Sequence, residues 1–169
     1  MRQRSQPVGK FDQQIKKLVQ DVQETLKTIK EVRGVGLSAV QIGVNKRLFA
    51  IERSGQITFF INPVIIRQSK TTLHQKLPVK GRFLEGCLSI PDVYGEVDRP
   101  YQIEAKWQDE TGQEQQAKFK GKEAAYWQHE YDHLEGVLFV DRVLAQKGKL
   151  YQTQKNQQGK EELTEVKLG

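Results

Sequence analysis

The chain has 169 residues and a formal net charge of +6, from 27 Lys and Arg against 21 Asp and Glu. Hydrophobic residues make up 37% of it, which is enough for a buried core and excludes a fully disordered protein. The charge excess is too small for a dedicated nucleic-acid site, and no apolar run approaches a membrane span. We expect a single domain over residues 1–169, with a Lys- and Gln-rich segment from about residue 145.

The N-terminal stretch and the cysteine content bear on the cellular compartment. Residues 1–7 are basic but lack the apolar stretch of a signal peptide. Cys87 is the single cysteine of the sequence, which excludes an internal disulfide. We therefore predict a cytoplasmic protein whose one thiol is either a small buried residue or a reactive group.

Two segments have the pattern of helices. In residues 11–32 apolar side chains recur at the spacing of one helical face, Asp12 is placed to cap the start, and Gly34 follows as a break. Residues 122–135 contain neither Gly nor Pro, and Gly136 is a suitable stop. The first segment is interpreted as a packing helix, and the second contains the main chemical motif.

Short alternating segments predict strands. Turn residues separate two pairs of them, which predicts hairpins with arms at 46–51 and 57–61, and at 103–107 and 117–119. Residues 64–66 extend the first sheet, while 68–82 are polar and basic and remain unassigned. The tail forms either a terminal hairpin, with arms near 150–151 and 163–166, or a frayed end.

The strongest chemical signal lies in the second predicted helix. His129 and His133 are four residues apart, so both imidazoles lie on one helical face and can reach one point. Glu130 lies between them and can take a proton from a water on the same metal. This His-Glu-x-x-His pattern is typical of metal hydrolases, although two solvated histidines on a helix would produce it too.

A catalytic metal usually has three protein ligands. The candidates for the third are a carboxylate, His74 and Cys87. His74 lies in the unassigned polar stretch and is interpreted as a surface residue. Cys87 alone is more often a small buried residue, but a thiolate is a strong ligand, and beside two histidines it is the favoured candidate.

Three blocks of sequence together resemble one family. Residues 34–41 (GVGLSAVQ) resemble the first peptide deformylase motif, G-x-G-L-A-A-x-Q. Residues 85–89 (EGCLS) and 129–133 (HEYDH) are identical to the second and third motifs, and the order is the same. The resemblance runs from about residue 4 to about residue 142, which is most of the chain.

The resemblance implies a fold and an activity. The fold would be α+β, with antiparallel β-sheets packed around a central helix that contains the third motif. The activity would be hydrolytic removal of the N-formyl group from the N-terminal methionine of newly synthesised proteins, with release of formate. Cys87, His129 and His133 would bind one divalent metal ion, most often Fe²⁺ in this family, with Zn²⁺, Ni²⁺ or Co²⁺ as substitutes.

The resemblance also assigns roles in the reaction. Glu130 would be the general base, and the Gln41 side chain and the backbone N–H of Leu88 would stabilise the oxyanion. Without the resemblance, Gln41 would be read as an ordinary polar residue at a strand edge.

Substrate contacts are carried over in the same way. Val35 and Gly36 would contact the peptide, and Ala125 and Tyr126 would face the same cleft, one helical turn before the first histidine ligand. Arg99 aligns with a substrate-side arginine of the family, and the equally weighted alternative is a solvent-exposed charge.

Two residues depart from the family pattern. Ser38 replaces the first alanine of the first motif, and its hydroxyl needs a hydrogen-bond partner if it is buried. Tyr126 stands where many members have an aliphatic or small residue, so it is expected to reshape the pocket.

The expected partners are N-formyl-methionyl nascent polypeptides, with a transient ribosome contact as a further suggestion and no membrane. Two other functions remain as alternatives. One is another His-Glu-x-x-His amidase or peptidase, and the other is a non-catalytic, ribosome-associated basic module with a structural metal. The block at 85–89 argues against the first, and the presence of Glu130 and Gln41 argues against the second.

Overall fold

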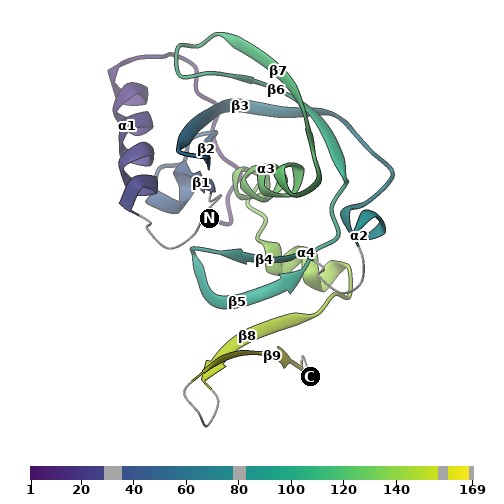
Figure 1. Ribbon diagram of the computed structural model, residues 1–169. Helices are drawn as coiled ribbons and strands as arrows, with labels where there is room; N and C mark the ends of the chain where they lie inside the picture. Colours follow the sequence, from purple (N-terminus) through teal and green to yellow (C-terminus); the bar gives the residue numbers. More distant parts are fainter. Residues whose placement is uncertain (29–35, 78–82, 156–159, 168–169) are drawn as a thin grey trace.

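The computed structural model describes residues 1–28, 36–77, 83–155 and 160–167. Its strands form two antiparallel sheets with the helix α3 (Gly121–Leu134) between them (Figure 1). The five-stranded sheet has the order β1 (Gly36–Ser38), β2 (Leu48–Arg53), β3 (Gln56–Gln68), β6 (Gln102–Gln108), β7 (Glu114–Lys120). The four-stranded sheet has the order β4 (Leu84–Cys87), β5 (Ile90–Glu96), β8 (Leu150–Lys155), β9 (Glu161–Val166). The expected α+β fold with antiparallel sheets is confirmed.

The predicted hairpins form as β2–β3 and β6–β7, and the tail forms the hairpin β8–β9. Strand β3 continues through residues 64–66 to Gln68, and the unassigned stretch after it contains the short helix α2 (Leu73–Lys76). Two shorter elements, the 3-10 helix η1 (Ala39–Ile42) and α4 (Phe139–Ala145), were not predicted. Residues 78–82 lie outside the described residues.

The first helix, α1 (Gln13–Thr28), forms for the reasons that its sequence suggests. The Asp12 carboxylate accepts hydrogen bonds from the backbone N–H groups of Gln14 (3.0 Å) and Ile15 (3.1 Å), which caps the helix. Its apolar face is buried against the first three strands, and the buried residues are Ile15, Leu18, Val22 and Leu26. The last part of the predicted helix, from residue 29, lies outside the described residues.

An aromatic cluster fixes how α3 lies on the five-stranded sheet. Trp127 is fully buried, and its ring centroid lies 5.2 Å from that of Phe49 and 6.0 Å from that of Phe60. Tyr131, one turn further along, stacks on Trp127 at 5.3 Å. Because these side chains hold one face of α3 against the sheet, its histidines face the other side.

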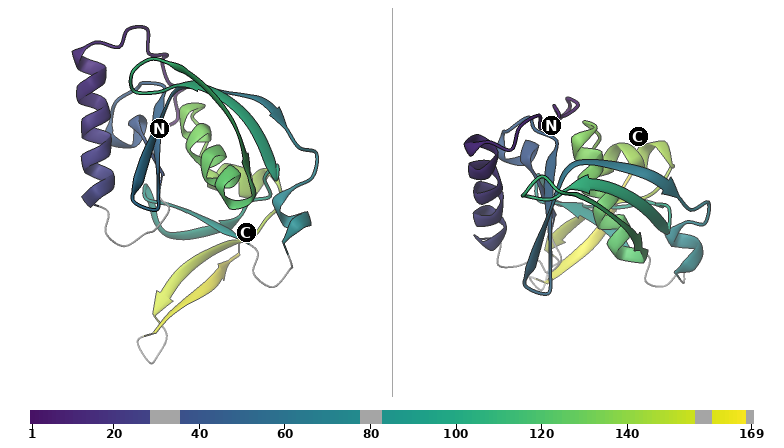
Figure 2. Two further views of the ribbon diagram at one scale, coloured as in Figure 1. Left: turned by 45° about the horizontal axis from the view of Figure 1, so that its top comes forward. Right: turned by 90° about the horizontal axis from the view of Figure 1, so that it is seen from above.

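The four-stranded sheet closes the other side of α3 and holds the C-terminal hairpin. Strand β5 pairs with β8, and Gly95 in β5 lies so close to α4 that an added Cβ would be 2.5 Å from Cγ2 of Val143. The hairpin β8–β9 extends away from the rest of the fold (Figure 2). Every residue of β9 is exposed. No helix in the described ranges has the length and apolar character needed to cross a membrane.

Candidate active site and metal centre

The fold brings the predicted metal ligands together. Cys87 ends β4, while His129 and His133 lie in α3, and the possible ligand atoms of the three residues all lie within 4.8 Å of one another. Cys87 Sγ is 3.4 Å from Nε2 of His133. A thiol and two imidazoles form a donor set that suits Zn²⁺, Fe²⁺ and related borderline ions.

The orientation of one imidazole supports a metal site. Nδ1 of His129 lies 3.0 Å from Oε2 of Glu85, so its Nε2 is left for the cluster. Metal-binding histidines commonly give their other ring nitrogen to a carboxylate in this way, which fixes the tautomer and the ring orientation. The residues present therefore fit a bound metal ion.

Glu130 is buried beside this cluster and against β1. Its side chain packs on Gly36 so closely that a Cβ added there would lie 2.5 Å from Cγ and 2.6 Å from Cδ of Glu130. Oε2 of Glu130 has no hydrogen-bond partner among the described residues. Burial raises the pKa of Glu130 to about 7, although His129 and Arg99 act in the opposite direction. A carboxylate poised near neutral pH is suited to accept and return a proton.

This packing predicts the effect of the smallest change at Gly36. The Gly36→Ala variant is expected to lose about 100-fold in turnover, because the added methyl displaces the Glu130 carboxylate and a shift near 1 Å can cost that much. Formate release is the measurement, with metal content determined in parallel. Gly9→Ala is the matched control, since nothing lies within 4 Å of a Cβ at Gly9. Near-normal turnover of Gly36→Ala would contradict the steric argument.

Gln41 lies in η1, so the alternative of an ordinary polar residue at a strand edge is wrong. Its Oε1 accepts two hydrogen bonds of 2.8 Å from Ser38, one from the backbone N–H and one from the hydroxyl. Its Nε2 lies 3.1 Å from Oγ of Ser89 and 3.7 Å from Sγ of Cys87. Ser38 is fully buried, and its hydroxyl has the partner that burial requires.

A cleft of about 500 Å³ lies along this cluster, between β4, β5 and α3. Eight of the predicted site residues line it: Gly36, Gln41, Cys87, Leu88, Ala125, Tyr126, His129 and Glu130. Tyr126 also packs edge-on against Phe83, with ring centroids 5.3 Å apart, so it narrows one part of the cleft. Val35 lies outside the described residues, and His133 is buried behind the lining.

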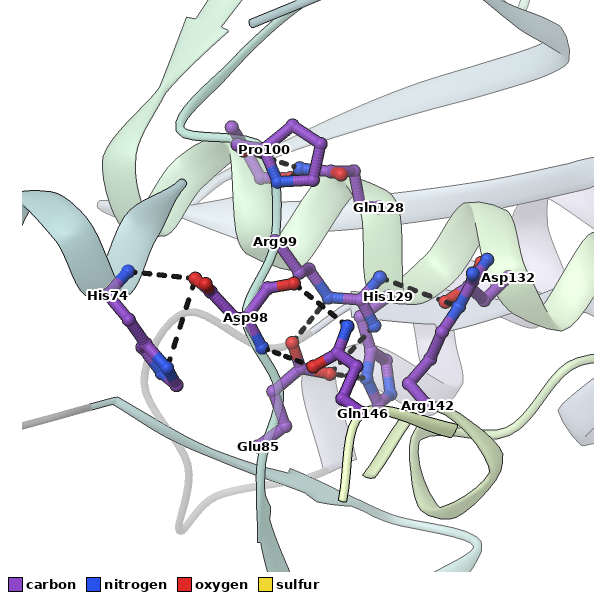
Figure 3. A network of polar contacts seen from close by, with 11 residues as sticks. His74, Glu85, Asp98, Arg99, Pro100, Gln128, His129, Asp132, Arg142 and Gln146 are labelled. Atoms are coloured by element: carbon purple, nitrogen blue, oxygen red, sulfur yellow. Dashed lines mark hydrogen bonds and ion pairs between the residues drawn. The ribbon is translucent and has the colours of Figure 1, made fainter. Parts of the chain in front are cut away.

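Arg99 is buried, so the alternative of a solvent-exposed charge is wrong, and Arg99 is not among the residues that line the cleft. Its guanidinium forms a bidentate pair with Glu85 and donates to Asp132 Oδ2 at 2.9 Å (Figure 3). Arg142 in turn donates to both oxygens of Asp132, at 2.6 and 3.0 Å. Glu85 and Asp132, the two carboxylate partners of Arg99, are thus both buried and paired.

The positive charge and the hydrogen bonds around Glu85 lower the pKa of its carboxyl group. Burial alone would raise the pKa of Glu85, but the Arg99 charge and the hydrogen bonds from Arg99 and His129 outweigh it and lower the pKa to about 2. Glu85, Asp132 and Arg142 were not predicted to be parts of the site. Glu85 and Asp132 could have been found from the sequence, because both are acidic residues within the motifs that contain the metal ligands.

His74 is the third histidine, and it is not the surface residue that was predicted. Its side chain is 11% exposed, and its Nδ1 lies 3.8 Å from Oδ1 of Asp98 (Figure 3). The backbone N–H of His74 donates to the same oxygen at 2.9 Å. His74 therefore belongs to the structure around α2, away from the metal cluster.

Comparison with known proteins shows to which family the chain belongs. The sequence model of the family described as polypeptide deformylase matches residues 1–149. The chain belongs to the polypeptide deformylase family. Its activity is therefore that of a metal-dependent hydrolase that removes the N-formyl group from an N-terminal methionine. Family membership favours this activity over the peptidase and the non-catalytic module.

Individual family members agree in sequence and in structure. The peptide deformylase of Rhizobium meliloti is 40% identical over 148 residues, which cover 85% of this chain and 79% of the relative. The crystal structure of the Thermotoga maritima deformylase is 35% identical, has a TM-score of 0.73, and covers 83% of this chain and 88% of its own. A deformylase structure from Synechococcus elongatus, in complex with actinonin, is 37% identical with a TM-score of 0.73, covering 83% and 71% of the two chains.

Proposed function

We propose that Cys87, His129 and His133 hold one divalent metal ion, Fe²⁺ in the cell, and that Glu130 is the general base of deformylation. The observation that carries this proposal is the convergence of one thiol, two imidazoles and a buried carboxylate at one cleft. When bound, the ion acts as a Lewis acid and lowers the pKa of water. Glu130 accepts the proton of the attacking water and returns it to the departing amine.

Gln41 and Leu88 stabilise the negative charge that develops on the formyl oxygen. Nε2 of Gln41 lies on the thiol side of the cleft, within 3.7 Å of Sγ of Cys87. The backbone N–H of Leu88 follows directly after Cys87 in the turn between β4 and β5. Donors that are held in place before the reaction stabilise an oxyanion without any reorganisation.

The formylated N-terminus lies in the cleft described above, which is lined by β4, β5 and α3 and by Gly36 of β1. Gly36 contacts the peptide from the first motif, while Ala125 and Tyr126 bound the pocket from α3. Because the ring of Tyr126 packs on Phe83, this pocket is narrower than one bounded by a small residue. Arg99 supports the site through Glu85 and does not contact the substrate.

Removal and replacement of the metal tests this function. Metal-free protein is expected to release no formate from a formyl-methionyl peptide, and activity should return with Fe²⁺, Ni²⁺ or Zn²⁺ under anaerobic conditions, highest with Fe²⁺. Alanine at Cys87, His129 or His133 should lower metal affinity by at least about 100-fold, because fewer than three ligands remain. Full activity of rigorously metal-free protein, or stoichiometric metal in the Cys87→Ala variant, would contradict the proposal.

The cellular setting follows from the substrate. Formylated N-termini occur on newly synthesised proteins, so the proposed place of action is the cytoplasm. The proposed catalytic domain comprises residues 1–169. The Lys- and Gln-rich segment from about residue 145 forms the β8–β9 hairpin and is the candidate for a transient ribosome contact. Deletion of residues 150–169 should then weaken co-sedimentation with ribosomes.

A further inference from the structure

The contacts of Gln41 define which way its amide points. A backbone N–H can only donate, so the amide atom 2.8 Å from the Ser38 nitrogen must be the oxygen. The amide NH₂ therefore faces the opposite side, where Ser89 Oγ and Cys87 Sγ lie at 3.1 and 3.7 Å. The turn that follows β1 thus presents the donor end of Gln41 to the cleft.

The Ser38 hydroxyl adds a second donor to the same oxygen. Its Oγ is also 2.8 Å from Oε1 of Gln41, and the whole residue is inaccessible to solvent. Two donors on one acceptor oppose rotation of the amide, and they polarise it so that its N–H groups become stronger donors. An alanine at this position would keep the backbone contact and lose the hydroxyl one.

The two N–H groups of Gln41 differ in how firmly they are used. The contact with Ser89 Oγ has ordinary hydrogen-bond length, whereas the contact with Cys87 Sγ is long. The N–H on the thiol side is therefore the one that can turn to a substrate oxygen at the metal cluster. Its direction depends on how firmly the other end of the amide is held.

We propose that Ser38 is a positioning residue, whose hydroxyl holds the Gln41 amide in the orientation that stabilises the oxyanion. This inference rests on the proposed function, because it requires Gln41 to be the oxyanion donor. Ser38 does not touch the substrate and acts only through Gln41. Its contribution should therefore appear in kcat, since the held amide matters most in the transition state.

A double-mutant cycle with NMR tests this role. The Ser38→Ala variant is expected to lower kcat about fivefold, the effect of one neutral hydrogen bond, with KM changed less than about twofold. In the Gln41→Ala background the same substitution should change kcat by less than about 1.5-fold. With ¹⁵N-labelled glutamine, the Gln41 side-chain amide of zinc-loaded and metal-free protein should lose exchange protection in Ser38→Ala.

Ser5→Ala is the matched control, because Ser5 is also buried and its hydroxyl has no hydrogen-bond partner among the described residues. It should leave kcat and the Gln41 amide signal unchanged. An equal loss of kcat from Ser38→Ala with and without Gln41, or an unaltered Gln41 signal, would overturn the positioning role. If Gln41→Ala instead kept full kcat, the oxyanion role in the proposed function would be wrong, and with it this inference, while the NMR comparison would still report whether Ser38 orients the amide.

Discussion

Glu130→Gln is expected to retain its metal and to lose roughly 10²–10⁴-fold in kcat, the usual range for removal of a general base. Glutamine has nearly the shape of glutamate, so it keeps the packing against Gly36 in β1. It cannot accept a proton, so the attacking water would not be activated and the amine would leave without a proton. Formate release at saturating substrate, with metal content determined by elemental analysis, is the measurement.

The matched control for this variant is Glu123→Gln on the same helix. Glu123 lies at the surface and pairs with Arg53 at 2.7 Å, in a pair whose side chains are 41% and 73% exposed. Its replacement should leave kcat within about twofold and change stability by less than about 1 kcal/mol. A Glu130→Gln protein with wild-type kcat would remove Glu130 from the proposed mechanism. Loss of the metal in that variant would instead make Glu130 a structural part of the metal site.

The Arg99→Met variant is expected to be less stable by about 3–5 kcal/mol, because it leaves two buried carboxylates without their shared partner. Glu85 would lose both hydrogen bonds from the guanidinium, and Asp132 would keep only those from Arg142. Because Glu85 orients His129, metal affinity should fall by about 10–100-fold as well. Urea unfolding measures the first effect, and competition with a chelator measures the second.

Arg53→Met provides the comparison for this buried network. Arg53 is an exposed arginine with one carboxylate partner, so its loss should cost less than about 1 kcal/mol and leave metal affinity unchanged. If Arg99→Met were as mild as Arg53→Met, the buried network would not support the metal site. A loss of stability without a loss of metal affinity would confine the role of Arg99 to folding.

Local sequence was sufficient to predict the first helix, α3, the hairpins and the shared helical face of the two histidines. Helical spacing placed His129 and His133 on one face of α3, and turn residues between alternating segments predicted the β2–β3 and β6–β7 hairpins. These are short-range patterns, in which the residues that cause a structure lie within a few positions of it. Cys87 lies 46 residues from His133, so no local spacing pointed to it; the ligand chemistry of a thiolate beside two histidines favoured it, and the resemblance to known motifs supported it.

The roles of Arg99, Gln41 and Gly36 depended on partners that are distant along the chain. Arg99 pairs with residues 14 and 33 positions away, and the amide of Gln41 meets Ser89, 48 positions away. The sequence around a single arginine does not indicate whether distant carboxylates will pair with it, so the burial of Arg99 was not predictable. Gly36 matters because α3 brings the Glu130 side chain against it. The sequence therefore established which chemical groups this enzyme has. The packing of the two sheets on α3 established which of these groups are buried, which are paired and which face the cleft, because burial and pairing depend on contacts between distant segments.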